Sequence, residues 1–194
     1  EIILATTKKS EDDVLVDLCR KLKILTFRGS EQNVLNRFYF AAKYFNANII
    51  VRITADDPFK DPSIIDSVIN KFIVHKKYDY VSNNMVPTFP LGLDVEVFSI
   101  DTLEKVFIEA YTEFDKEHVT SFIHQNHNLF NTFNFSYHKD LSNYRWTIDT
   151  KDDFVLAKEI YRNLYPKKRY FNMGDILSLL TKNPFINELN SKKN

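Results

Sequence analysis

The hydrophobic positions of this chain alternate between short apolar runs and longer stretches with a helical period. The short runs predict strands at residues 2–6, 25–27, 49–54, 78–82, 94–98, 133–137 and 144–148. The periodic stretches predict helices at about 11–22, 31–45, 62–72, 102–110, 117–126, 151–165 and 173–180. Strands and helices that alternate in this order favour βαβ units, so we expect an α/β fold with a mostly parallel sheet.

Polar residues stand where several of these helices begin. Four of them can accept a hydrogen bond from the first helical turn and are predicted N-caps: Ser10, Ser30, Asp61 and Thr150. Asp61 is followed by Pro62 at the first helical position, and Thr150 is followed by Asp153 at the spacing of a capping box.

Two acidic segments follow predicted strands and carry the most informative chemistry. Asp56 and Asp57 follow the strand at 49–54, which is apolar almost throughout and which we expect to be buried on both faces. Asp149 follows the strand at 144–148. Ligands of open α/β sheets bind beyond the carboxyl ends of the strands, so Asp56 and Asp149 would both face that crevice. Mg²⁺ takes carboxylate oxygens together with waters and phosphates, which indicates a magnesium–nucleotide site.

A structural interpretation of the same residues stays open. Asp57-Pro58 has the composition of a turn, and Asp149-Thr150 that of a helix cap. Arg145 lies four positions before Asp149, on the same face if the segment is a strand, and could steady a phosphate or pair with the carboxylate.

A long segment without periodicity, residues 83–92, separates two predicted strands. Loops of this length inside a domain are usually functional. Gly92 stands near its end, where a turn or a close approach would exclude a side chain. Asp94 and Glu96 follow at a spacing of two, so they share a strand face and could bind hydroxyl groups or form an exposed polar face.

Composition narrows the class of protein. The 194 residues are 44% hydrophobic, which suffices for one full core, and we read a single domain. Lys+Arg and Asp+Glu both number 26, a balance that argues against a broad nucleic-acid surface. No apolar run approaches the roughly 20 residues that cross a bilayer. Cys19 is the single cysteine, so the chain cannot form an intramolecular disulfide and we expect a reducing, cytoplasmic environment. The helical face on which Cys19 lies predicts a buried apolar position.

Six sequence blocks resemble one family. They are residues 27–38 (FRGSEQNVLNRF), 51–58 (VRITADDP), 80–83 (YVSN), 90–98 (PLGLDVEVF), 117–120 (EHVT) and 145–150 (RWTIDT). In this order and spacing they are similar to the cytidylyltransferases of the spore coat polysaccharide biosynthesis (SpsF) group. That group is akin to the acylneuraminate and 3-deoxy-manno-octulosonate cytidylyltransferases. The blocks cover nearly the whole chain, which makes the resemblance specific.

The resemblance implies a Rossmann-like, three-layer fold of the nucleotide-diphospho-sugar transferase type. It implies that Asp56 and Asp149 are the catalytic carboxylates that hold Mg²⁺. It further implies two groups of binding residues, Arg28, Gly29, Ser30 and Thr54 for the nucleotide, and Asn83, Gly92, Asp94, Glu96, Glu117, His118 and Arg145 for the acceptor substrate. For Gly29 and Ser30 a turn and helix cap is an alternative role that can coexist with ligand contact. His118 could be a base or a donor to the acceptor, or Glu117 and His118 could only begin a helix.

The family also begins with an element that this sequence does not contain. Its members open with a strand and a loop of the form Ala-Arg-x-x-Ser-x-Arg-Leu-Pro-Gly-Lys, which grips the nucleotide phosphates. Residues 2–6 match the second strand of the family, so we expect an N-terminally truncated domain at 1–185, followed by a tail at 186–194. Such a chain is expected to be a weak or inactive catalyst.

Three functions are consistent with these observations. The first is a cytidylyltransferase that joins CTP and a sugar or sugar acid into a CMP-sugar, with release of pyrophosphate, for surface polysaccharide biosynthesis. The second is a glycosyltransferase of related fold that uses a nucleotide-sugar, since fold alone does not fix the reaction. The third is a non-catalytic nucleotide-binding fragment. None of these three functions requires nucleic acid or a membrane, and each is compatible with a homodimer.

Overall fold

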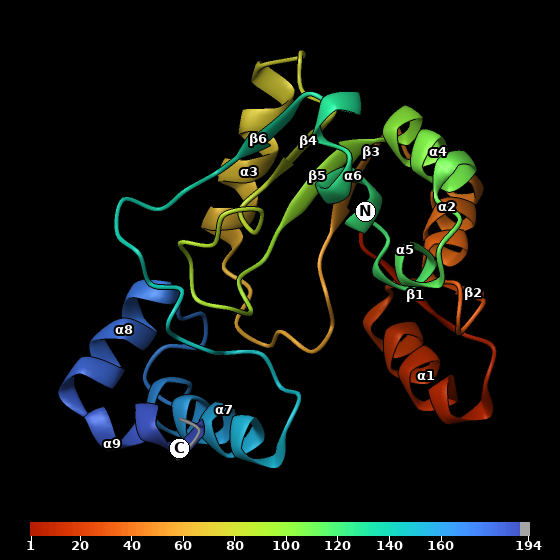
Figure 1. The fold of residues 1–194 in the computed structure, drawn as a ribbon. Coiled ribbons are helices and arrows are strands. Elements are labelled where there is room, and N and C mark those ends of the chain that lie inside the picture. Colours follow the sequence, from red (N-terminus) through yellow and green to blue (C-terminus); the bar gives the residue numbers. More distant parts are fainter. Residues whose placement is uncertain (191–194) are drawn as a thin grey trace. The chain divides into compact units, whose positions relative to one another are not determined.

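A computed structural model describes residues 1–190 of the chain (Figure 1). The contacts within the chain divide it into two units. Unit 1 comprises residues 1–50, 77–80 and 98–132, and unit 2 comprises residues 51–76 and 81–97 with the chain from residue 133 onward. The single domain expected at 1–185 stays a prediction.

Unit 1 begins with a βαβ segment. Strands β1 (Ile3–Thr7) and β2 (Leu25–Gly29) are parallel, with Ile3 opposite Leu25 and Thr7 opposite Gly29. Between them lie a 3₁₀ turn, η1 (Ser10–Asp12), and helix α1 (Asp13–Leu22). The parallel pairing confirms the βαβ prediction for this part of the chain. Cys19 is a free, buried residue of α1, as its helical face predicts.

Two of the predicted N-caps are wrong. Ser10 begins the 3₁₀ turn, and Asp12 precedes α1. Helix α2 (Val34–Tyr44) is capped by Asn33, which accepts from the Asn36 N–H at 2.8 Å. Ser30 Oγ instead accepts from the Asn33 N–H at 3.0 Å, so it orders the turn before the cap.

Unit 1 also contains most of the shorter helices of the chain. It contains α4 (Ile100–Glu109), α5 (Glu113–His118), α6 (Ser121–Gln125) and η2 (His127–Leu129). Helix α2 packs against α4 and α5, and the Tyr39 and Phe107 rings stack with centroids 4.2 Å apart. The single helix predicted at 117–126 is wrong, because the chain leaves the helical conformation at Val119.

A four-stranded sheet has the order β3-β5-β4-β6. Its strands are β3 (Ile49–Arg52), β4 (Tyr80–Ser82), β5 (Glu96–Ser99) and β6 (Thr132–Asn134). Strand β3 is at one end of this order, and the burial on both faces predicted for it is wrong. Ile50 is buried, whereas Ile49 and Val51 on the opposite face are exposed.

Two helices of unit 2 begin where their predicted caps lie. Asp61 accepts from the Ser63 N–H at 2.9 Å and starts α3 (Pro62–Val74). Thr150 and Asp153 form a complete capping box at the start of α7 (Lys151–Leu164). Both predictions are confirmed. Helix α8 (Met173–Lys182) and the short α9 (Pro184–Asn187) and η3 (Glu188–Asn190) pack around α7 (Figure 1).

Residues 186–190, which the sequence places in a tail, therefore form helical turns, and Ile186 is buried. The rest of the predicted tail, 191–194, lies outside the described residues. In the part of the chain that the structure describes, none of the helices has the length and apolar character that a membrane crossing requires.

Candidate active site

The two acidic segments lie side by side in unit 2. The Ile148 N–H donates to the Asp56 carbonyl at 2.9 Å, which places Asp149 one residue from the turn that carries Asp56. Asp56 is an exposed residue, and the Asp149 side chain is 52% exposed. The fold thus brings together the two backbone segments that carry the carboxylates proposed as metal ligands.

The strand predicted at 144–148 is wrong. The segment makes an isolated parallel bridge in which Arg145 pairs with Leu91. The Leu91 N–H donates to the Tyr144 carbonyl at 2.9 Å, and the Trp146 N–H donates to the Leu91 carbonyl at 2.7 Å. This bridge ties the segment before Asp149 to the loop at 83–92.

Gly92 allows that close approach. Its φ is 106°, a conformation that L side chains rarely adopt. A Cβ atom there would lie 2.8 Å from the Thr147 nitrogen and 2.8 Å from the Trp146 carbonyl carbon. The structure confirms that a side chain at this position is obstructed, and the obstruction is backbone.

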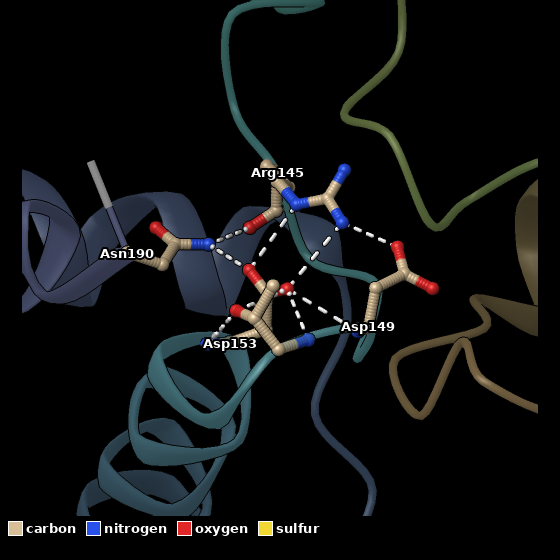
Figure 2. Close-up of polar contacts among 5 residues, drawn as sticks. Arg145, Asp149, Asp153 and Asn190 are labelled. Carbon is tan, nitrogen blue, oxygen red and sulfur yellow. Dashed lines mark hydrogen bonds and ion pairs between the residues drawn. The ribbon is translucent and has the colours of Figure 1, made fainter. Parts of the chain in front are cut away.

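Arg145 lies between two carboxylates (Figure 2). Its Nε donates to Asp153 Oδ1 at 3.2 Å, and its Nη2 donates to Asp153 Oδ2 at 3.3 Å. The same Nη2 makes a short hydrogen bond to Asp149 Oδ2. Of the two roles left open for Arg145, pairing with Asp149 is therefore the one seen in the structure, although the two residues are not on a strand.

Asp153 is the centre of this cluster. It is 2% exposed and accepts hydrogen bonds from the Asp149 and Thr150 N–H groups, from Thr150 Oγ1 and from Asn190 Nδ2. Burial alone would raise the pKa of the Asp153 carboxyl, but the hydrogen bonds from Asn190, Arg145 and Thr150 outweigh it. The pKa therefore lies well below its ordinary value, and the carboxylate stays charged.

A second charged cluster lies at the turn after β3. Thr54 Oγ1 donates to Asp57 Oδ2 at 2.5 Å, and Lys60 Nζ lies 2.8 Å from the same carboxylate oxygen. Lys60 Nζ also donates to the Asp94 carbonyl. The Asp57 and Lys60 side chains are 4% and 12% exposed. Thr54, proposed as a nucleotide contact, therefore donates its hydroxyl within this turn.

Asp94 differs from Glu96 in its surroundings. Glu96 is buried and makes a short ion pair with Arg52. Asp94 precedes β5 and is half-buried, and this burial raises the pKa of its carboxyl despite the opposing charge of Lys60. The two carboxylates therefore do not share a strand face, because β5 begins only at Glu96.

Asn83 holds the loop in place. Its Nδ2 donates to the Leu93 carbonyl at 2.9 Å, and its Oδ1 accepts from the Val95 N–H at 2.7 Å. These bonds fix the backbone on both sides of Asp94. Asn83 and Glu96 thus support the segment that carries Asp94, and Asp94 is more accessible than either of them.

The proposed nucleotide residues of unit 1 line a pocket of about 720 Å³. Arg28, Gly29 and Ser30 contribute at the end of β2, and the remaining wall is basic and aromatic, formed by Lys8, Phe27, Asn36, Phe40, Lys43 and Tyr44. The Arg28 guanidinium donates to the carbonyls of Thr7 and Lys9 and to Asp13 Oδ1, at 2.8, 2.6 and 2.6 Å. Arg28 therefore shapes the pocket wall and holds the loop after β1.

Glu117 and His118 are exposed at the end of α5 in unit 1. The next residue, Val119, is fully buried and has φ 57° and ψ −55°. The Thr120 N–H donates to the His118 carbonyl at 2.5 Å, which closes a γ-turn of the rare positive-φ kind. A β-branched residue in this conformation is strained, and such strain is concentrated at functional sites.

Several residues of these clusters were not among the sequence candidates. Asp153 was expected only as a cap, and Asp57 only as a turn residue. Lys60 carries a weak signal, because it lies three positions after Asp57. Asn190 carries no such signal in the sequence, because it lies 37 positions from Asp153 and only folding brings the two residues together.

Comparison with known proteins decides the family. The cytidylyltransferase family profile matches residues 1–178. The chain belongs to the cytidylyltransferase family. It is 39% identical over 193 residues to the uncharacterized protein MJ1063 of Methanocaldococcus jannaschii, and this match covers 98% of the chain and 77% of MJ1063. It is 32% identical over 188 residues to the spore coat polysaccharide biosynthesis protein SpsF of Bacillus subtilis, covering 94% of this chain and 75% of SpsF.

A solved structure of a cytidylyltransferase from Leptospira borgpetersenii is similar to this cytidylyltransferase, with a TM-score of 0.91 and 30% identity. The match covers 95% of this chain and 77% of that one. These matches confirm the resemblance drawn from the six sequence blocks. They also confirm the α/β fold of the nucleotide-diphospho-sugar transferase type and the assignment as a cytidylyltransferase-type nucleotidyltransferase.

Proposed function

We propose that this cytidylyltransferase transfers CMP from CTP to a sugar acid, for surface polysaccharide biosynthesis in the cytoplasm. The observation that carries the proposal is the pairing of the Asp56 and Asp149 segments, which presents two accessible carboxylates from neighbouring backbone. The name of the SpsF relative supports the connection to polysaccharide. The sugar acid follows from the resemblance to acylneuraminate and 3-deoxy-manno-octulosonate cytidylyltransferases.

The donor set at Asp56 and Asp149 fits Mg²⁺. Within residues 1–190, no three His, Cys, Asp or Glu side chains gather in a way that could hold a metal ion. Mg²⁺ commonly binds through one or two carboxylates and completes its shell with water and substrate phosphates, so two carboxylates suffice. When bound, Mg²⁺ would neutralise charge on the triphosphate oxygens as pyrophosphate leaves.

The chain's own residues would bind and orient the substrates. In the reaction, a hydroxyl oxygen of the sugar acid attacks the α-phosphorus, the bond to the β-phosphate oxygen breaks, and the hydroxyl proton passes to a base or to water. Such a transfer depends mainly on positioning and electrostatics. We assign the acceptor hydroxyl to Asp94, supported by Asn83, and the nucleotide to the basic and aromatic pocket lined by Arg28.

The test is product analysis with CTP, MgCl₂ and a panel of sugar acids, made on a full-length protein that carries the strand and phosphate-gripping loop with which the family begins. Pyrophosphate and a CMP-sugar should appear in equal amounts. Release of a nucleoside diphosphate from a nucleotide-sugar would instead identify a glycosyltransferase. Absence of product with every nucleoside triphosphate and acceptor would contradict the proposal.

Two variants connect the activity to the proposed metal ligands. Asp56→Asn and Asp149→Asn should each remove most turnover while the melting temperature changes little, because both side chains are exposed. Asp152→Asn is the matched control, since it removes an exposed carboxylate three positions from Asp149 and should keep wild-type turnover.

A further inference from the structure

The Arg145 guanidinium binds two carboxylates of very different exposure (Figure 2). Asp153 is 2% exposed and holds Arg145 through both Nε and Nη2. The Asp149 side chain is 52% exposed and receives one hydrogen bond, from Nη2. One contact is therefore a buried anchor, and the other lies at the surface where a solute can reach it.

The anchor does not depend on Arg145 alone. Asp153 keeps hydrogen bonds from Thr150 Oγ1 at 2.9 Å and from the Thr150 N–H at 3.0 Å, and Asn190 Nδ2 donates to it at 2.9 Å. The same Asn190 Nδ2 donates to the Arg145 carbonyl at 2.9 Å. The backbone of Arg145 is fixed on its other side by the bridge to Leu91. The position of the arginine is thus set by the fold and not by Asp149.

The contact with Asp149 occupies Oδ2, one of the two carboxylate oxygens through which a metal ion could bind. A guanidinium N–H and a divalent cation both bind the lone pairs of a carboxylate oxygen, and the two positive charges repel each other at this range. Arg145 and a metal ion therefore compete for Asp149 Oδ2. In the structure, Arg145 Nη2 donates to this oxygen.

We propose that Arg145 is a positioning residue that serves as the counter-cation of Asp149 until a divalent cation displaces it. The proposal rests on the assignment of Asp56 and Asp149 as the metal pair. Displacement breaks the hydrogen bond from Nη2 to Asp149 and leaves the bonds to Asp153 in place. Arg145 then stays next to the metal with one free N–H edge, which suits a phosphate oxygen of the nucleotide. The arginine thereby couples metal loading to phosphate binding.

The experiment measures binding of Mn²⁺ to the whole chain without nucleotide, from the loss of the electron paramagnetic resonance signal of free Mn²⁺. Arg145→Gln should lower the apparent dissociation constant roughly three- to tenfold, the effect of removing one screened unit charge beside a divalent ion. Arg162→Gln is the matched control, because Arg162 is 77% exposed and pairs with Glu159 on α7. It should leave Mn²⁺ binding unchanged.

The outcomes separate this inference from the proposed function. If Asp149→Asn abolishes Mn²⁺ binding and Arg145→Gln tightens it, both stand. If Asp149→Asn abolishes binding but Arg145→Gln leaves it unchanged or weaker, the metal pair stands and the competition is refuted. If neither wild type nor Arg145→Gln binds Mn²⁺, both are refuted.

A second measurement needs no variant of the cluster. Nitrogen-15 NMR of the wild-type arginine side chains should show a protected Arg145 Nε–H signal that shifts as Mg²⁺ is added, while the Arg162 signal stays in place. An Arg145 signal insensitive to Mg²⁺ at concentrations that saturate Asp149 would overturn the inference, even if Arg145→Gln does not fold.

Discussion

Asn190 Nδ2 donates to Asp153 Oδ1 at 2.9 Å and so joins the last described turn to the start of α7. The same nitrogen donates to the Arg145 carbonyl. One amide group therefore connects η3, the α7 cap and the segment that carries Asp149. The region around the proposed metal ligands depends on a residue distant in sequence.

We predict that Asn190→Ala destabilises the protein. The substitution removes two hydrogen bonds, one of them to a buried carboxylate, and this costs roughly 1–3 kcal/mol. Urea denaturation of wild type and variant measures the change in unfolding free energy. Asn143→Ala, at an exposed loop position, is the control and should change stability little. Equal midpoints for Asn190→Ala and wild type would show that the contact contributes nothing.

Local signals in the sequence predict the starts of two helices of unit 2 well. Asp61 before Pro62 and Thr150 before Asp153 fix the starts of α3 and α7, because a cap depends on residues within one turn. The pairing of Arg145 with Asp149 was also among the sequence alternatives, since four positions separate them. Its anchoring by Asp153 and Asn190 was not, because it needs tertiary contacts.

Apolar runs were the least reliable signal. The run before Asp149 predicts a strand, yet it makes only a bridge to Leu91, because Gly92 lets the two segments meet without a sheet. The run at 49–54 predicts a strand buried on both faces, yet Ile49 and Val51 are exposed and the order of the described strands places it at an end. The helix predicted at 117–126 breaks at Val119, where tertiary packing overrides the local preference for a helix. The periodicity of the sequence shows which residues are apolar, but it does not show which other segments of the chain they contact.

We predict a strong position dependence for glycine substitutions. Gly92→Ala places a Cβ 2.8 Å from backbone atoms at φ 106°, so it should cost several kcal/mol, roughly 2–4. Gly174→Ala is the matched control, because its nearest neighbour is a side-chain oxygen at 3.4 Å and it lies in α8. It should be neutral or stabilising by up to about 1 kcal/mol. Thermal melts of both variants check this, and a Gly92→Ala melt equal to wild type would contradict the close approach.

The low pKa of the Asp12 carboxyl predicts how the stability of the protein changes in acid. Hydrogen bonds from Thr6 Oγ1 and from the hydroxyl and N–H of Thr7 lower the pKa of this carboxyl to about 2. A lowered folded-state pKa stabilises the protein above the unfolded-state pKa, and this contribution is lost as pH falls toward about 2. Asp12→Asn should therefore lower the melting temperature at pH 6 and reduce its dependence on pH below about 4. Parallel melting curves for both proteins between these pH values would refute the assignment.

Asp94 is predicted to govern the acceptor and not the nucleotide. It precedes β5 on a backbone fixed by Asn83, and Lys60 binds its carbonyl rather than its carboxylate. Asp94→Ala should therefore raise the KM for the sugar acid, or lower kcat with it, by about tenfold or more, while the KM for CTP changes little.

Burial raises the pKa of the Asp94 carboxyl, and this separates the functional role from a structural one. A raised folded-state pKa means that ionisation of Asp94 costs folding stability, and the cost grows as pH rises from the unfolded-state pKa through the folded-state value. Asp94→Asn should consequently keep or raise the melting temperature at pH 7 while impairing the acceptor. Steady-state kinetics for each substrate and a melt of the same variant decide the matter. Equal losses for CTP and sugar acid, together with a lower melting temperature, would assign Asp94 to folding.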